Sequence, residues 1–112
     1  MADMSPALDL TIDSARLIDR LDTLAEVGAI PGTAGCSRLA LTDDDRAGRD
    51  LVVTWMRDLG LEVTIDGIGN VFATMTSPSG APVMAGSHID TVATGGRYDG
   101  NLGVLAGLEV IE

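Results

Sequence analysis

The chain has 112 residues, an apolar fraction of 46% and a formal net charge of −10. This length fits one domain with a buried core, and an aromatic fraction of only 3% requires that core to be aliphatic. The acidic charge excludes nucleic acid and anionic membrane surfaces as expected partners, because both bind clustered cations. The single cysteine, Cys36, cannot form an intrachain disulfide and predicts a reducing, cytoplasmic setting.

Residues 1–12 are expected to form a loose acidic leader, without the basic start and apolar run of a signal peptide. Residues 13–112 are expected to form the folded domain. Its first helix is predicted over 13–27, and Gly28 suits the left-handed position that ends a helix. Apolar residues recur there at three- and four-residue steps and predict one buried stripe: Leu17, Ile18, Leu21, Leu24 and Ala25.

A second helix is predicted from Thr42 to Gly60, with Thr42 as its N-cap and Asp45 in the capping-box position. The acidic run 43–45 suits the positive end of the helix dipole. A calcium site is the alternative for this run, but the glycine and glutamate spacing of a calcium loop is absent. The expected buried face consists of Leu51, Val52, Trp55, Met56 and Leu59.

Residues 61–66 and 71–75 are predicted to form a hairpin, because the first run alternates apolar and polar residues and a glycine-rich turn joins the two. A third strand is predicted over 83–87, where small and apolar residues indicate burial on both faces. The last helix, over 102–112, is apolar nearly all round and is expected to be deeply buried. It also lacks a stop signal, which predicts that the chain is the front end of a larger domain.

One histidine and two aspartates carry the candidate chemistry. His88, the only histidine, follows the predicted third strand, Asp90 comes two residues later, and Asp99 ends a glycine-rich loop before the last helix. A neutral imidazole is a good ligand for zinc and similar ions, and a carboxylate often holds its other ring nitrogen. We therefore predict His88 and Asp99 as metal ligands and Asp90 as the carboxylate that orients His88. A structural histidine, a loop-capping Asp90 and a helix-capping Asp99 remain the alternative.

These residues stand within motifs that resemble a known family. Residues 86–92, 95–100 and 103–109 closely resemble the hydantoinase/carbamoylase family of metal-dependent amidases. That family includes N-carbamoyl-L-amino-acid hydrolases, allantoate amidohydrolases and β-ureidopropionases, within the superfamily of two-metal aminopeptidase-like hydrolases. Upstream, residues 38–42, the Asp-rich start of the second predicted helix with Arg46 and Arg49, and residues 69–71 are also similar, so the resemblance covers about residues 13–112.

The resemblance implies an α/β fold: the N-terminal portion of a two-metal aminopeptidase-like catalytic domain, with a mixed sheet packed with helices, truncated before the lid and dimerisation domain and the C-terminal half. By the same resemblance, His88 is a ligand of one metal, Asp99 bridges two metals, and Asp90 is the catalytic residue that orients the histidine. The implied cofactors are two divalent ions, with zinc first and manganese, cobalt or nickel as alternatives. The implied partners are a small ureido or carbamoyl substrate and, for a full-length parent, a second copy in a homodimer.

The implied reaction is hydrolysis of a non-peptide linear amide or ureido C–N bond. Peptidases of the superfamily tend to follow the bridging aspartate with a Lys-Gly pair, whereas Gly100 and Asn101 follow Asp99 here, after a short loop. Three alternatives remain open: a metallopeptidase of the same superfamily, a phosphate-binding α/β module, and a non-catalytic remnant. The family's general-base glutamate and further histidine ligands are not in the chain, so we expect the 112-residue chain alone to be inactive. Cys36 is expected to be a packed thiol and not a zinc ligand.

Overall fold

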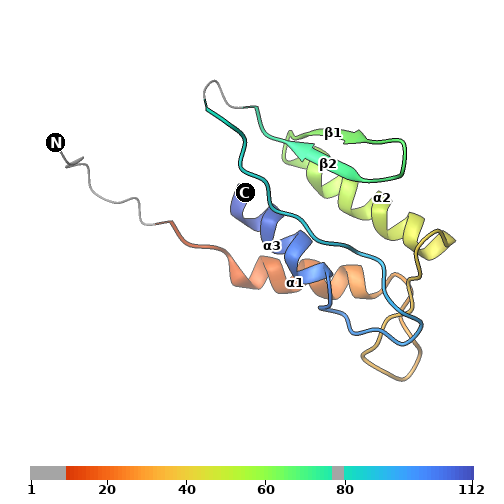
Figure 1. The fold of residues 1–112 in the computed structure, drawn as a ribbon. Helices are drawn as coiled ribbons and strands as arrows, with labels where there is room; N and C mark the ends of the chain where they lie inside the picture. The colour runs from red at the N-terminus through yellow and green to blue at the C-terminus, as the bar shows by residue number, and fades with distance from the viewer. Residues whose placement is uncertain (1–9, 77–79) are drawn as a thin grey trace.

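The structure is a computed structural model that describes residues 10–76 and 80–112. Most of the predicted leader, residues 1–9, and the centre of the predicted loop, residues 77–79, lie outside the described residues. Three helices and a two-stranded sheet are formed (Figure 1), and their bounds are α1 Ser14–Ala25, α2 Asp43–Asp58, β1 Glu62–Ile65, β2 Val71–Thr74 and α3 Asn101–Ile111. The predicted combination of helices with a sheet is confirmed.

Helix α1 begins at its predicted N-terminal cap and ends two residues before the predicted end. The Asp13 carboxylate caps it by accepting from the backbone N–H of Arg16 at 3.0 Å, and Gly28 follows with φ of 81°. The predicted stripe is confirmed except at Ile18, which is 54% exposed. Neighbouring elements cover the face centred on Leu21, and Ile18 projects beyond its edge because successive helical residues differ by about 100° in direction.

Helix α2 has the predicted N-terminal cap. The Thr42 hydroxyl accepts from the backbone N–H of Asp45 at 3.3 Å. The Asp45 carboxylate accepts in return from the N–H of Leu41 at 3.1 Å, one residue earlier than in the standard capping box. Leu41 has a left-handed φ of 67°, which turns its N–H toward the helix. The bonds made by Thr42 and Asp45 confirm the capping interpretation for this end of α2.

Strands β1 and β2 form the predicted antiparallel hairpin, with Glu62 opposite Thr74 and Ile65 opposite Val71. Asp66 organises its turn. The Asp66 carboxylate accepts from the Asn70 side-chain amide at 2.9 Å, the Asn70 backbone at 2.9 Å and the Ile68 backbone at 3.0 Å. These bonds, led by that from the Asn70 side chain, lower the pKa of Asp66 below its usual range because they favour the charged form.

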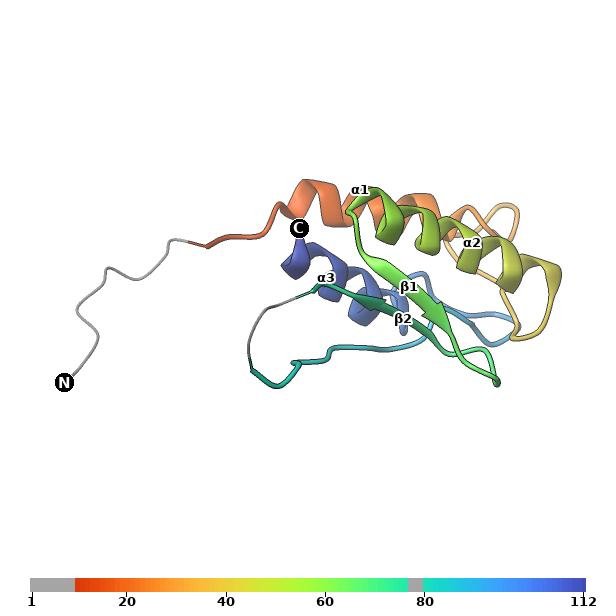
Figure 2. The same cartoon turned by 90° about the horizontal axis from the view of Figure 1, so that it is seen from above.

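The predicted third strand is not formed. Residues 80–92 run in an extended path beside α3 (Figures 1 and 2) without a strand partner among the described residues. The prediction of burial on both faces is also wrong, since Val83 is fully exposed and Met84 is 76% exposed. Helix α3 covers one side of the segment. The two lie close together, because a Cβ added at Gly103 of α3 would lie 2.7 Å from the Cβ of Ser87.

The elements pack in two layers around an aliphatic core. Figure 2 shows α1 and α2 side by side above α3 and the hairpin. Helix α3 is not buried all round as predicted, because Leu102 is 47% and Val110 is 76% exposed. One stripe alone faces α1 and α2. The core is formed by Leu17, Leu21, Leu24, Val52, Leu61, Leu105 and Leu108.

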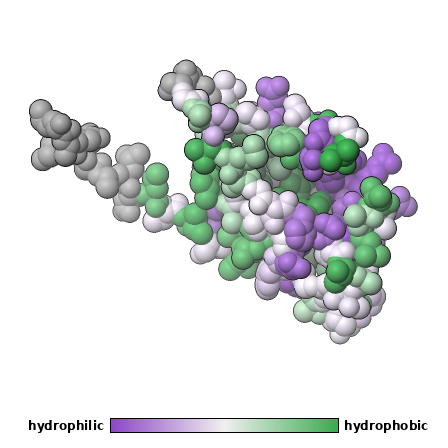
Figure 3. Space-filling model, viewed as in Figure 1, coloured by the Kyte–Doolittle hydropathy of each residue, from purple (hydrophilic) through white to green (hydrophobic). Residues whose placement is uncertain are grey.

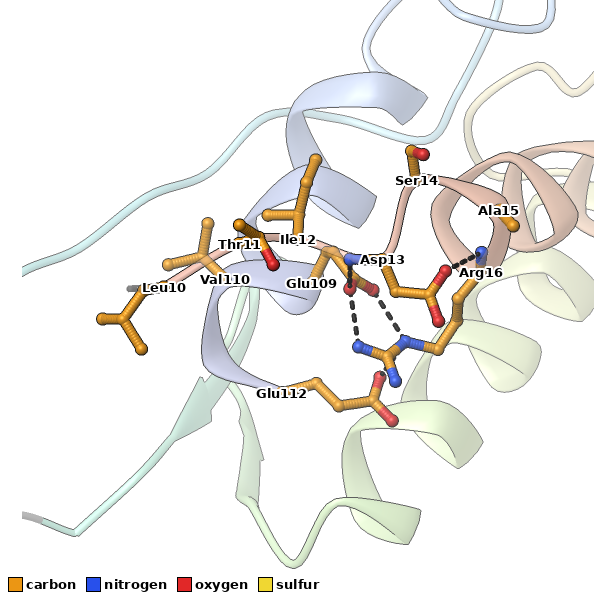
Figure 4. A pocket seen from close by; sticks show the side chains of 10 residues that line it. All are labelled: Leu10, Thr11, Ile12, Asp13, Ser14, Ala15, Arg16, Glu109, Val110 and Glu112. Carbon is orange, nitrogen blue, oxygen red and sulfur yellow. Dashed lines mark hydrogen bonds and ion pairs between the residues drawn. The ribbon is translucent and has the colours of Figure 1, made fainter. Parts of the chain in front are cut away.

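Charged side chains join α1 to the end of α3 (Figure 4). Glu109 is 3% exposed, and its carboxylate accepts from Arg16 Nη2 at 2.6 Å and Arg16 Nε at 2.9 Å. Glu112 lies 2.7 Å from Arg20 Nη1. A carboxylate near a helix C-terminus is unfavourable by itself, but the arginines of α1 offset this. The Arg16 bond lowers the pKa of Glu109, and the same bond raises the pKa of Arg16.

Arg16, Glu109 and Glu112 also border a cavity of about 760 Å³ between residues 10–16 and the end of α3 (Figure 4). Across the described ranges, no helix combines the length and the apolar character needed to cross a bilayer.

Candidate functional site

The extended segment before α3 brings His88 and Asp90 together. His88 Nδ1 lies 3.0 Å from the backbone oxygen of Asp90 and 3.3 Å from its Oδ1. Both Asp90 atoms are acceptors, so Nδ1 carries the ring hydrogen in this arrangement. The His88 side chain is 52% exposed. A ring that donates from Nδ1 presents Nε2 as the nitrogen able to bind a metal ion.

The turn that carries Asp99 lies directly against His88. Gly100 has φ of 76°, and a Cβ added there would collide with His88 Cε1, Nδ1 and backbone oxygen. Asp99 precedes this glycine and is exposed. The absence of a side chain at Gly100 thus allows the backbone next to Asp99 to approach the imidazole. The fold brings the backbone of the Asp99 turn to the His88–Asp90 pair, although eleven positions separate His88 from Asp99 in the sequence.

A cavity of about 390 Å³ opens beside His88 and Asp90. Its other polar walls are Asp45 and Arg49 from α2, Asn70 from the hairpin turn and Ser87 from the extended segment. Arg49 Nε is buried and makes no hydrogen bond with the described part of the chain, although it lies 3.7 Å from Asp50 Oδ1. Sequence reasoning did not identify Arg49 or Asn70 as cavity residues. Both stand in segments that resemble the family, but only the fold places them around the same cavity as His88.

Arg38 is the other residue whose importance the sequence did not reveal. It is fully buried, and its Nε donates to the backbone oxygen of Ile89, between His88 and Asp90, at 2.9 Å. Cys36 lies nearby, is also fully buried, and donates from Sγ to the Val27 oxygen at 3.3 Å. The prediction of Cys36 as a packed thiol is confirmed.

The residues present fit part of a metal site. His88 combines an accessible ring with a partner on Nδ1, and Gly100, which has no side chain, lets the Asp99 turn approach that ring. Within residues 10–76 and 80–112, no three His, Cys, Asp or Glu side chains are grouped closely enough to hold an ion. His88 and Asp99 therefore remain predicted ligands, and Asp90 remains the predicted orienting carboxylate.

Comparison with known proteins gives consistent matches in sequence. No protein-family model matches the chain. It is 43% identical over 110 residues to an N-carbamoyl-L-amino-acid amidohydrolase of Rhizobium meliloti, covering 96% of this chain and 26% of that protein. It is 39% identical over 94 residues to an allantoate amidohydrolase of Bacillus subtilis, covering 82% of this chain and 23% of that protein.

Solved structures agree with the sequence matches. The fold superimposes on the crystal structure of a hydantoinase/carbamoylase family amidase from Burkholderia ambifaria with a TM-score of 0.87 and 54% identity, covering 91% of this chain and 25% of that one. The chain thus spans about a quarter of the length of the relatives it matches. In both sequence and fold, the chain is therefore similar to one segment of amidohydrolases that act on N-carbamoyl-L-amino acids or allantoate and of hydantoinase/carbamoylase family amidases.

Proposed function

We propose that this chain carries part of the catalytic domain of a hydrolase for non-peptide linear amide or ureido C–N bonds, of the N-carbamoyl amino acid or allantoate type. The observation that carries the proposal is the arrangement around His88: Asp90 engages Nδ1, and Gly100 brings the Asp99 turn against the ring. The relatives named for such reactions supply the substrate class.

His88 and Asp99 are the residues that would hold divalent ions, with Asp99 shared between two of them. Zinc is the first candidate, and manganese, cobalt or nickel would suit the same nitrogen and oxygen donors. Such ions polarise a carbonyl oxygen and make a nucleophile available from water near neutral pH. Asp90 keeps the ring hydrogen of His88 on Nδ1 and fixes the direction in which Nε2 points.

The cavity beside His88 has a volume in the range of small-molecule sites. Its polar walls suit a ureido substrate, because Arg49 supplies hydrogen-bond donors and Asn70 supplies both donors and an acceptor. We further propose that the complete protein works as a homodimer. Residues 13–112 would then be one part of its catalytic domain.

Metal binding is tested by titrating zinc into the 112-residue chain and following the imidazole by NMR. The assignment is unambiguous because His88 is the only histidine. We expect zinc to shift the His88 ring signals, with a clear loss of affinity in Asp99→Asn. Asp58→Asn, at an exposed position at the end of α2, is the matched control and should bind zinc as the parent chain does. Ring signals that zinc leaves unchanged would contradict the ligand assignment.

Catalysis is tested in a chimera in which this chain replaces the matching segment of the Rhizobium meliloti relative. We expect the chimera to release the free amino acid from an N-carbamoyl-L-amino acid, and His88→Ala to abolish this activity. Asp58→Asn should again have no effect. A folded chimera that does not hydrolyse the substrate, beside an active R. meliloti enzyme, would overturn the proposal.

A further inference from the structure

We propose that Arg38 is a positioning residue that holds the His88–Asp90 segment in place relative to the start of α3. The proposal rests on the function proposed above, because it assigns Arg38 a role in the geometry of that site. Arg38 is distinguished by its environment: it is fully buried, and its partners are backbone carbonyls, a thiol and an amide. A buried cation is costly unless its donors are satisfied, so this one requires a close set of partners.

The guanidinium of Arg38 joins three parts of the fold. Nη1 donates to the backbone oxygens of Leu24 at 2.9 Å and Val27 at 2.7 Å, at the C-terminal end of α1. Nε donates to the Ile89 oxygen at 2.9 Å, and Nη2 donates to Asn101 Oδ1 at 3.1 Å. The negative end of the α1 dipole compensates the positive charge. The planar fork of donors fixes the directions of all these bonds together, which a lysine could not do.

The backbone of Arg38 adds a second connection to the same segment. Its N–H donates to Thr91 Oγ1 at 2.7 Å, and its carbonyl oxygen accepts from the N–H of Thr91 at 2.7 Å. Bonds at Ile89 and Thr91 therefore enclose Asp90 and adjoin His88. Because Asp90 contacts His88 Nδ1 through both its backbone and its side chain, a shift of this segment would change the direction of the imidazole.

At its other end, the guanidinium reaches the turn that carries Asp99. Asn101 is fully buried, and its amide nitrogen donates to the Arg97 oxygen at 2.9 Å. Asn101 thus fixes the turn 97–101, including Asp99 and Gly100, while its oxygen is held by Arg38. Helix α2 accommodates the arginine only because Gly48 has no side chain, since a Cβ there would lie 2.8 Å from Arg38 Cδ. Arg38 therefore links the segment bearing His88 to the segment bearing Asp99.

The test compares Arg38→Lys, which keeps the charge and loses the fork, with Leu21→Ala, a core variant away from these bonds. Zinc affinity is read from the His88 ring signals, and stability from urea unfolding of the 112-residue chain. We expect Arg38→Lys to weaken zinc binding about tenfold or more, as for other residues that support metal ligands, and to shift the His88 and Thr91 signals without zinc. Leu21→Ala should retain the zinc affinity of the parent chain at an equal or greater loss of stability.

Equal loss of zinc affinity in both variants would overturn the proposal, because the effect would then follow from stability alone. Zinc binding by Arg38→Lys that equals that of the parent chain would also overturn it. If Arg38→Lys does not fold, Thr91→Val removes one Arg38 bond and should shift the His88 signals in the same way. Unshifted signals in Thr91→Val would overturn the proposal.

If zinc leaves the ring signals of the parent chain unchanged, the proposed metal site fails. The positioning role is then judged from the metal-free spectra: shifts in Arg38→Lys but not in Leu21→Ala support it, and their absence overturns it.

Discussion

Gly100 is the residue on which the approach of the Asp99 turn to His88 depends most directly. It combines a left-handed φ of 76° with direct contact between its backbone and the imidazole. The first property disfavours any side chain, because a Cβ is crowded in the left-handed region. The second excludes a side chain for lack of space. The cost of backbone strain can be separated from the cost of the clash by comparison with Gly60. Gly60 has a similar φ of 78°, but no atom lies within 4 Å of the position that a Cβ would take there.

Gly60→Ala is expected to destabilise the chain by about 1–2 kcal/mol through backbone strain alone. Gly100→Ala should cost about 1–3 kcal/mol more, because the new methyl group must displace His88. Urea unfolding of both variants measures the difference. Equal losses of stability would show that the contact between Gly100 and His88 contributes nothing.

Among the elements, α3 has the least uniform surroundings. Leu105 is fully buried in the core, whereas Leu102, nearly one turn earlier, is 47% exposed. The helix therefore contributes to the core through one stripe, although its sequence is apolar on nearly every side. On another side of α3, the absence of a side chain at Gly103 allows the segment bearing His88 to lie close against the helix.

Leu105→Ala is expected to lower the free energy of unfolding by about 2–5 kcal/mol, because it leaves a cavity among α1, α2 and α3. Leu102→Ala, which changes the same residue type in the same helix, should change it by about 0.5 kcal/mol. Denaturant titration checks both values. A comparable loss in Leu102→Ala would mean that α3 is covered on more sides than the structure shows.

Glu109 makes the contact between α1 and α3 dependent on pH. The bond from Arg16 lowers the pKa of Glu109 in the folded chain below its unfolded value, which lies near 4.3. The carboxylate therefore stabilises the fold above about pH 4.3, and this contribution is lost as the pH falls through the folded pKa.

We expect the melting temperature of the parent chain to fall more steeply between about pH 5 and pH 3 than that of Glu109→Gln. The glutamine at position 109 carries no charge that protonation could remove. Glu62→Gln, at an exposed position in β1, should keep the steep profile. Parallel profiles for the parent and Glu109→Gln would contradict the contribution assigned to Glu109.

The whole molecule presents many apolar side chains to solvent, and its charge offsets them. Green residues stand among purple ones across the face seen in Figure 3. The most exposed large apolar side chains in the described ranges are Leu41, Val83, Ile68, Leu10, Met84 and Val110. A net charge of −10 keeps copies of the chain apart at neutral pH, so solubility should depend on that charge.

Solubility is expected to reach a minimum near pH 4.2, the isoelectric point of the sequence, because repulsion between copies disappears there. Turbidity at a fixed protein concentration, from pH 7 to pH 3, measures this. The control is Met84→Asp, which replaces an exposed apolar side chain and should remain clear at higher concentration near the minimum. A parent chain that stays equally soluble at every pH would rule out charge as the controlling factor.

The sequence alone determined the parts of this protein that depend on neighbours a few residues apart. Capping residues and three- to four-residue periodicity predict α1 and α2, alternation and a glycine turn predict the hairpin, and a spacing of two predicts that Asp90 can reach His88. Each of these is a local property, so the identity of nearby residues is sufficient.

Tertiary structure decided what depends on distant partners. Composition predicted a strand over 83–87 and a helix buried all round, but the exposure of a side chain depends on which elements cover it, and only one side of each is covered here. Arg38 is the clearest case. Its sequence neighbours do not predict burial, because a cation can be buried only where carbonyls from α1, the His88 segment and the start of α3 converge on it, and that convergence exists only in the folded chain.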